Sequence, residues 1–140
     1  GRTDDVINVA GHRLSTGEME QIVASHPAVA ECCVIGIHEP IKGQQPLAMV
    51  LLKNGSFIEE TVLEAELAAM VRKDIGALAC FKKAIIVKRL PKTRSGKILR
   101  KLLRQIAAGT EYSIPSTIDD PACLAEIANI MTEKQLVGQL

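Results

Sequence analysis

Aromatic residues are almost absent from this sequence. Phe57, Phe81 and Tyr112 are the only three in 140 residues, and there is no tryptophan. The core must therefore be built mainly from Leu, Ile, Val, Ala and Met. Proteins that bind single-stranded nucleic acid stack bases on aromatic side chains, so this scarcity argues against that class of function.

Cysteine motifs and long apolar runs are also missing. The four cysteines (Cys32, Cys33, Cys80 and Cys123) form no CxxC pair and no Cys/His cluster, so a zinc site is not indicated. Cys32 and Cys33 stand in an apolar run, where thiols behave as small hydrophobic side chains. Free thiols favour a reducing compartment, either the cytosol or the mitochondrial matrix. No signal peptide and no run of roughly 20 apolar residues is present. A chain that begins at Gly1 is expected to be excised from a longer protein, whose targeting segment this sequence would then lack.

Acidic residues are absent from one stretch of the chain. Residues 88–104, called the basic strip below, contain eight of the 17 Lys and Arg residues and no Asp or Glu, although the net charge is only +1. The remainder of the chain is therefore acidic. A basic strip on an acidic body indicates an anionic partner close to that strip.

The segment PKTRSGKILRK (91–101) lacks the parts of a P-loop, because Pro91 replaces the first glycine and Ile98 replaces the magnesium-binding Ser or Thr. Charge alone leaves three interpretations open: nucleic-acid contact, a solvated helix face, or a loop that presents one lysine to a substrate. The arrangement favours the last. Proline stiffens the entry and a Ser-Gly pair predicts a tight bend. Lys97 is then expected in the first turn of an apolar helix, where the macrodipole disfavours a cation unless an anion binds there.

Hydrophobic periodicity predicts a small α+β fold in the order β-β-α-β-β-α-β-α-α, a sheet of short strands flanked by helices. Expected strands cover residues 5–10, 12–15, 28–37, 46–53 and 82–88, and expected helices cover 15–25, 59–75, a stretch from 97, and 121 to about 136. Ser15 and Glu18 match a capping box at the first helix. We expect one domain over residues 1–109, with residues 110–140 forming a linker and a terminal helix that pack on the same domain.

Two longer motifs carry a family resemblance. GRTDDVINVAGHRLSTGEME (1–20) and PKTRSGKILRK (91–101) resemble the paired signatures of the C-terminal domain of acyl-CoA synthetases in the adenylate-forming superfamily. VRKDIG (71–76) and STIDDP (116–121) are similar to the short-chain acetyl- and propionyl-CoA synthetases, and the second leans toward the propionyl type. The resemblance covers essentially the whole chain and implies the fold of a mobile C-terminal lid.

The resemblance implies a two-step reaction. A short-chain carboxylate such as acetate or propionate reacts with Mg-ATP to give acyl-AMP and pyrophosphate, and coenzyme A then displaces AMP to give acyl-CoA. The implied cofactors and substrates are ATP, Mg²⁺ and coenzyme A, and the implied partner is the enzyme's own N-terminal domain, absent from this sequence. Neither nucleic acid nor a membrane span is implied. The fragment alone is expected to be inactive, and the expected compartment is the mitochondrial matrix or, alternatively, the cytoplasm.

The resemblance assigns roles in adenylation, domain rotation and ATP binding to four positions. Lys97 matches the lysine placed between the attacking carboxylate and the α-phosphate. Asp4 matches the hinge, and the alternative is a turn aspartate beside Asp5. Arg2 and Arg13 match arginines that hold ATP. The alternative for Arg13 is an exposed charged residue on a strand.

The resemblance assigns a further set of residues to the other ligands. The strand at 6–13, with Ala10 and Gly11, is implied to line the pantetheine tunnel for the thioester step, although a bend between two strands explains this pair as well. Arg72 is implied to hold a phosphate of coenzyme A and is equally explained as a favourable cation near a helix end. A magnesium ion is implied near Ala24, His26 and Val29, but His26 is an unusual ligand because magnesium prefers oxygen.

Two alternatives remain from the sequence. One is the lid of another adenylate-forming enzyme that loads a carrier protein instead of free coenzyme A. The other is a stand-alone module that binds an anionic partner through the basic strip.

Overall fold

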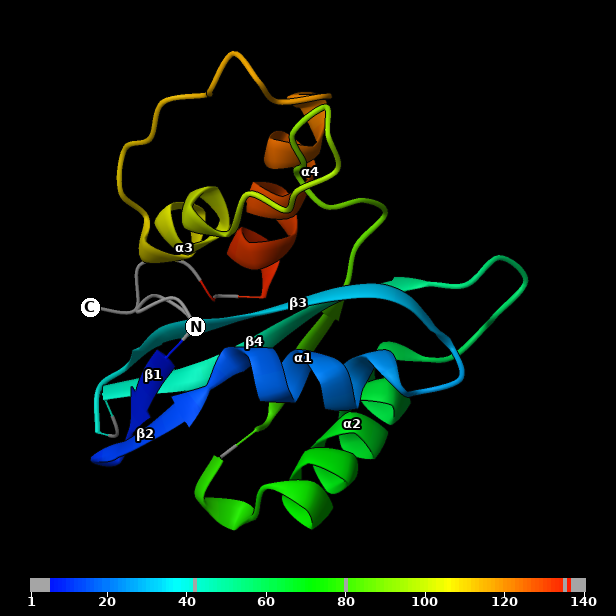
Figure 1. Cartoon of the computed structure of the whole chain (residues 1–140), viewed down its shortest axis with the longest axis vertical. Coiled ribbons are helices and arrows are strands. Elements are labelled where there is room, and N and C mark those ends of the chain that lie inside the picture. The colour runs from blue at the N-terminus through cyan, green and yellow to red at the C-terminus, as the bar shows by residue number, and fades with distance from the viewer. Residues whose placement is uncertain (1–5, 42, 80, 135, 137–140) are drawn as a thin grey trace.

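The computed structural model describes residues 6–41, 43–79, 81–134 and 136. Its elements follow the predicted order, with one additional short 3-10 helix (Figure 1). The strands are β1 (Val6–Val9), β2 (His12–Ser15), β3 (Val29–Glu39), β4 (Gly43–Leu52) and β5 (Lys83–Ile86). The helices are α1 (Thr16–Ala24), α2 (Glu60–Asp74), the 3-10 helix η2 (Ala77–Ala79), α3 (Arg100–Ala108) and α4 (Ala122–Glu133). The predicted α+β fold is confirmed.

Strand β4 is central in the five-stranded sheet. On one side it pairs with β3 in an antiparallel ladder that contains an irregularity between Val29 and Glu31. On its other side β4 pairs with β1 at Gly43 and, in parallel, with β5 over Leu47–Val50. The parallel pair is possible because α2 forms the crossover between β4 and β5. Strands β1 and β2 form a hairpin at one end of the sheet.

The β3–β4 hairpin is longer than the sequence predicts. The turn-rich stretch after Ile37 was expected to separate two strands, but His38 and Glu39 remain in β3, and β4 already begins at Gly43. The ladder continues because the polar residues pair through their main chains. The side chain of Gln44 adds a further bond, since its Oε1 accepts from the amide of Asn8 on β1 at 2.9 Å.

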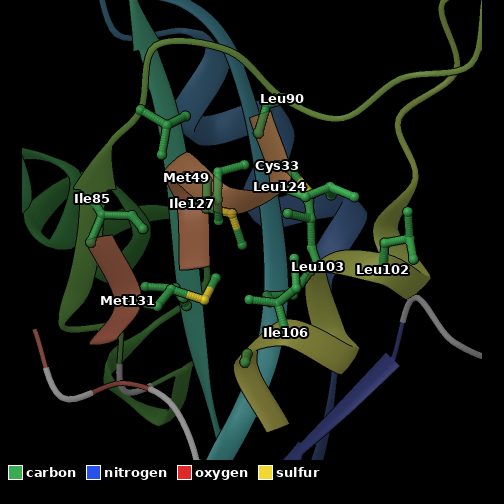
Figure 2. Close-up of a cluster of buried hydrophobic side chains, with 14 of the residues drawn as sticks. Cys33, Met49, Ile85, Leu90, Leu102, Leu103, Ile106, Leu124, Ile127 and Met131 are labelled. Atoms are coloured by element: carbon green, nitrogen blue, oxygen red, sulfur yellow. The ribbon is translucent and has the colours of Figure 1, made fainter. Parts of the chain in front are cut away.

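Each face of the sheet is covered by a pair of helices and has its own hydrophobic core (Figure 1). Helices α3 and α4 cover one face, and α1 and α2 cover the other. Strand β4 serves both, because Leu47 and Met49 point to the first core while Ala48 and Val50 point to the second, all fully buried. A strand covered on both faces reads as a continuous apolar run, as this one does. Figure 2 shows the first core, in which side chains of α3 and α4 meet those of the sheet.

The cysteines behave as small core side chains. Burial raises the pKa of Cys33 to about 12 and that of the half-buried Cys32 to about 11. Both are free thiols, as is the buried Cys123, so the prediction for the Cys32–Cys33 pair is confirmed. Cys80 lies outside the described residues.

Glutamates on the helices bond to the outer main chain of the edge strands. The amide of Val34 on β3 donates to Glu20 Oε2 of α1 at 3.0 Å. On β5, the amides of Ala84 and Ile86 donate to two carboxylates of α2 at 2.8 and 2.9 Å. These bonds fix the helices along the sheet and satisfy donors that have no partner strand. None of the helices in the described part of the chain is long and apolar enough to cross a membrane.

Candidate functional site

The loop between β5 and α3 is a short, closed hairpin. Lys92 and Ile98 form an antiparallel bridge, and the amide of Leu99 donates to the Pro91 carbonyl at 2.9 Å. The bend at the tip contains Gly96 with φ of 92°, a conformation that glycine adopts at little cost. Residues 91–99 are called the lysine loop below. Its closure by main-chain bonds gives it a defined shape.

Lys97 lies on this loop and not on a helix, so the expectation that it occupies the first helical turn is wrong. Helix α3 begins only at Arg100, because the bridge at Ile98 keeps the preceding chain extended. The macrodipole argument for an anion at Lys97 therefore does not apply. The main chain of Lys97 is held from both sides by Thr93, whose Oγ1 accepts from the Lys97 amide at 3.1 Å and whose amide donates to the Lys97 carbonyl at 2.9 Å.

The side chain of Lys97 is exposed. Within the described ranges no carboxylate pairs with it, nor with Arg94 or Lys101. A rigid main chain with a free ammonium group suits a cation that must meet a ligand from outside the domain.

Other cations of the basic strip are already neutralised. Arg89 pairs with Asp120 and Glu126, Lys92 with Glu31, and Arg100 with Glu20. The charge count suggested a continuous basic surface, but these ion pairs interrupt it. The unpaired charge is concentrated at and beside the lysine loop, which weakens the alternative of a nucleic-acid surface.

Ala10 and Gly11 form the two-residue turn between β1 and β2, so the stretch 6–13 contains two strands, as the expected strands at 5–10 and 12–15 predicted. Both have positive φ, 51° for Ala10 and 85° for Gly11, as a tight hairpin turn requires. Ala10 is the only non-glycine residue with positive φ among those described, which is a strained choice. Both residues are exposed, as is Arg13 on β2. The turn lies beside the β3–β4 hairpin, because Val9 pairs with Gly43.

Arg72 lies in the last turn of α2 and lines a groove of about 410 Å³. Phe81 contributes apolar surface to this groove and Lys82 a second exposed cation. A larger hollow of about 610 Å³ lies between α3 and residues 111–115, and contains none of the predicted site residues.

The imidazole of His26 does not fit a magnesium site. Its Nδ1 accepts from the Ala28 amide at 3.0 Å, so the proton resides on Nε2, which donates to Glu66 Oε1 at 2.7 Å. Both ring nitrogens are therefore occupied. No group of three His, Cys, Asp or Glu side chains in the described chain could hold a metal ion. A cation near Ala24, His26 and Val29 could use main-chain carbonyls only.

The predicted residues do not meet in one pocket. The lysine loop lies on the α3–α4 side of the sheet and Arg72 on the α1–α2 side, while the Ala10–Gly11 turn lies at one end (Figure 1). Asp4 and Arg2 lie outside the described residues. Groups so far apart cannot all contact one small ligand on this domain at once.

Sequence reasoning missed the acidic partners of the lysine loop. Glu20 and Glu31 pair with Arg100 and Lys92. Such pairing leaves no periodic signal, because the partners are far apart in the chain, by 80 residues for Glu20 and Arg100. The absence of acids within the basic strip was the one available hint that its partners come from elsewhere.

Comparisons with known proteins identify the family of this chain. The family model of the AMP-binding enzyme C-terminal domain matches residues 18–97, more than half of the chain. An uncharacterized protein of Pseudomonas aeruginosa is 64% identical over 127 residues, covering 91% of this chain and 20% of that protein. Human acyl-CoA synthetase short-chain family member 3, mitochondrial, is 49% identical over 133 residues, covering 94% of this chain and 19% of its own.

Solved structures give the same answer. An acyl-CoA synthetase of Brucella canis is similar with a TM-score of 0.68 and 41% identity, over 75% of this chain and 19% of that one. ATP-bound MatB from Rhodopseudomonas palustris has a TM-score of 0.67 and 27% identity, over 75% of this chain and 20% of its own. The chain therefore belongs to the AMP-binding enzyme C-terminal domain family, as the two sequence motifs indicated. It spans about a fifth of the length of the curated relatives that it matches.

Proposed function

We propose that this chain is the mobile lid of an AMP-forming, short-chain acyl-CoA synthetase. In the first step a carboxylate oxygen attacks the α-phosphorus of ATP, and pyrophosphate leaves. In the second step the thiol of coenzyme A attacks the acyl carbon, and AMP leaves. The lid would turn between these steps about Asp4, within a protein that also contains the larger N-terminal domain.

Lys97 carries the proposal for the first step, through the observation that its ammonium group is exposed and unpaired on a closed loop. Placed beside the reacting α-phosphate, it would stabilise the charge that shifts during attack. A unit charge pair at about 4 Å with an effective dielectric constant near 20 contributes roughly 4 kcal/mol. That corresponds to about a thousandfold in rate, so one lysine suffices to control the step. Arg2 and Arg13 are proposed to hold the nucleotide.

For the second step, the proposal assigns coenzyme A to two separate places. The exposed Ala10–Gly11 turn would lie against the thin pantetheine arm, since a glycine allows close approach of the main chain. Arg72, supported by Lys82 in the same groove, would hold a phosphate at the nucleotide end. A carrier-bound pantetheine has no such nucleotide end, so a basic groove favours free coenzyme A over a carrier protein.

The acyl substrate and the compartment are proposed from the names of similar proteins alone. Acetate or propionate is proposed because the similar human protein is named a short-chain synthetase. The mitochondrial matrix fits that relative's name, whereas the cytoplasm fits the bacterial relative.

The test is Lys97→Ala in the full-length enzyme that contains this chain. Pyrophosphate release from carboxylate and ATP should fall about a thousandfold. Acyl-CoA formation from supplied acyl-AMP should stay within about twofold, because Lys97 is withdrawn in that step. Lys101→Ala, which removes another exposed and unpaired lysine, is the matched control and should leave both rates unchanged. An equal loss in both half-reactions would refute the role given to Lys97.

A further inference from the structure

Ion pairs hold the chain at the start of the lysine loop and directly after its end. At its start, Lys92 Nζ lies 2.5 Å from Glu31 Oε1 on β3. Directly after its end, Arg100 donates to Glu20 of α1 through two nitrogens, at 2.6 and 3.1 Å. The two carboxylates and Ile98 of the loop line the same shallow hollow. Carboxylates of β3 and α1 therefore act as two anchors, one at the start of the loop and one directly after its end.

Glu20 is the stronger anchor. Its side chain is 16% exposed and that of Arg100 is 25% exposed, against 40% for Glu31. A paired guanidinium–carboxylate contact also fixes orientation, which a single ammonium contact does not. The same carboxylate accepts from the Val34 amide at 3.0 Å. Glu20 thus joins α1, β3 and the first residue of α3 at one point.

The position of Arg100 connects this point to Lys97. Arg100 follows Leu99, whose amide closes the loop onto Pro91, and it lies three residues beyond Lys97. Any shift of the start of α3 would therefore be transmitted to the closing bond and to Lys97. We propose that Glu20, through Arg100, is a positioning residue that sets the location of the Lys97 ammonium group for adenylation. This inference rests on the proposed function of Lys97.

Positioning and stability predict different results for Glu20→Gln. The substitution keeps the shape and one oxygen that can accept from Val34, but removes the charge that orients Arg100. A misplacement of about 1 Å at a reacting centre can lower a rate about a hundredfold, whereas the two hydrophobic cores, to which Glu20 does not belong, stay intact. Loss of positioning should therefore appear in catalysis without a comparable loss of fold.

The first experiment measures both half-reactions in the full-length enzyme. Glu20→Gln and Arg100→Gln should each lower pyrophosphate release by about tenfold to a hundredfold, with acyl-CoA formation from supplied acyl-AMP unchanged. The double variant should be no slower than the slower single one, because both substitutions break one contact. Lys134→Gln is the control, since it breaks a different ion pair, with Glu60. Equal loss in both half-reactions, or additive loss in the double variant, would overturn the inference.

The second experiment does not depend on activity. Amide hydrogen exchange in this 140-residue chain reports the cross-loop bonds from Leu99 to Pro91 and from Thr93 to Lys97. In Glu20→Gln these two amides should exchange about tenfold faster, while amides of the β3–β4 ladder stay unchanged. Unchanged exchange at Leu99 and Thr93 would overturn the inference even if Lys97→Ala blocks adenylation. Normal adenylation in Lys97→Ala would instead refute the proposed function, whatever the exchange shows.

Discussion

Gly36 on β3 lies against Ile7 of the β1–β2 hairpin and leaves no room for a side chain. A methyl group added there would lie 2.4 Å from Ile7 Cγ2 and 2.9 Å from the amide nitrogen of the Gln44 side chain. No real Cβ atom tolerates such distances, so β1 or its side chains would have to move. The hairpin that presents Ala10 and Gly11 thus depends on a residue without a side chain on a different strand.

We expect Gly36→Ala to lower the free energy of unfolding by about 1–3 kcal/mol, as overpacking does. Gly17→Ala is the matched control, because Gly17 lies in α1 and its added methyl would lie 3.5 Å from the hydroxyl oxygen of Ser15, an ordinary contact distance. It should raise the free energy of unfolding by about 0.5–1 kcal/mol. Urea titrations of both variants measure these changes. An unchanged free energy of unfolding in Gly36→Ala would show that β1 has room to move away from Gly36.

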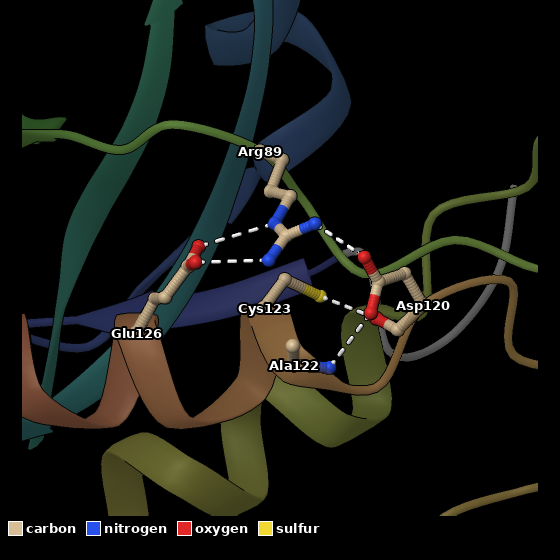
Figure 3. Close-up of polar contacts among 5 residues, drawn as sticks. All are labelled: Arg89, Asp120, Ala122, Cys123 and Glu126. Atoms are coloured by element: carbon tan, nitrogen blue, oxygen red, sulfur yellow. Dashed lines mark hydrogen bonds and ion pairs between the residues drawn. The ribbon is translucent and has the colours of Figure 1, made fainter.

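At the scale of elements, Arg89 attaches α4 to the segment that follows β5 (Figure 3). Its guanidinium group donates to both oxygens of Glu126, at 3.1 and 2.9 Å, and also pairs with Asp120, which accepts from the Ala122 amide at 3.0 Å. One arginine therefore holds the start of α4 and its second turn together. The hydrogen bond from Arg89 lowers the pKa of Glu126 below its ordinary value of 4.5.

This pKa shift gives the domain a specific acid sensitivity. Because the carboxyl group of Glu126 binds its proton more weakly when folded, it stabilises the fold above pH 4.5, and this contribution disappears as pH falls through its lower folded pKa. Arg89→Gln removes the cause. We expect the variant to lose less unfolding free energy than the parent chain between about pH 6 and about pH 3. Parallel urea titrations check this, and Glu126→Gln should behave like Arg89→Gln. An unchanged pH dependence in both variants would contradict the assignment.

For the molecule as a whole, α4 is part of the larger core. Ile127 and Met131 are at most 1% exposed and lie in the same cluster as Met49 of the central strand (Figure 2). We therefore expect residues 110–140 to unfold together with residues 1–109, in one cooperative transition.

Ile127→Ala should lower the free energy of unfolding by about 2–5 kcal/mol, because it leaves a cavity in a closely packed core. Val62→Ala is the control on α2, where Val62 is 45% exposed, and should change the value by at most about 0.5 kcal/mol. Circular dichroism and residue-resolved amide signals should give one common midpoint. Earlier melting of α4 than of the β3–β4 ladder would show that the terminal helix is a separate unit.

Much of this fold could be predicted from local signals. Apolar runs placed the strands, helical spacing placed α1 and α2, and Ser15 caps α1 as expected, with its Oγ accepting from the Glu18 amide at 3.2 Å. The start of α3 could not be predicted, because a main-chain bridge between Lys92 and Ile98 overrides the helical preference of that stretch.

The candidate site, too, could be predicted only where its signals are local in the sequence. Lys97 and the Ala10–Gly11 turn were found from motif and turn chemistry, which are local. The carboxylates that neutralise the basic strip were not, since they come from α1, β3, α4 and the residue Asp120 before α4, and meet the strip only after folding. Charge counted along a chain therefore overestimates the charge that a folded surface presents.

The glutamates that bond to the outer amides of β3 and β5 have one more consequence. An unpaired edge strand can form hydrogen bonds with a strand of a neighbouring molecule or of a partly unfolded copy, and so begin aggregation. Here helix carboxylates already occupy amides on both sides. If the domain moves as the proposed lid, its loops can meet ligands while these two edge strands stay protected from pairing with other molecules.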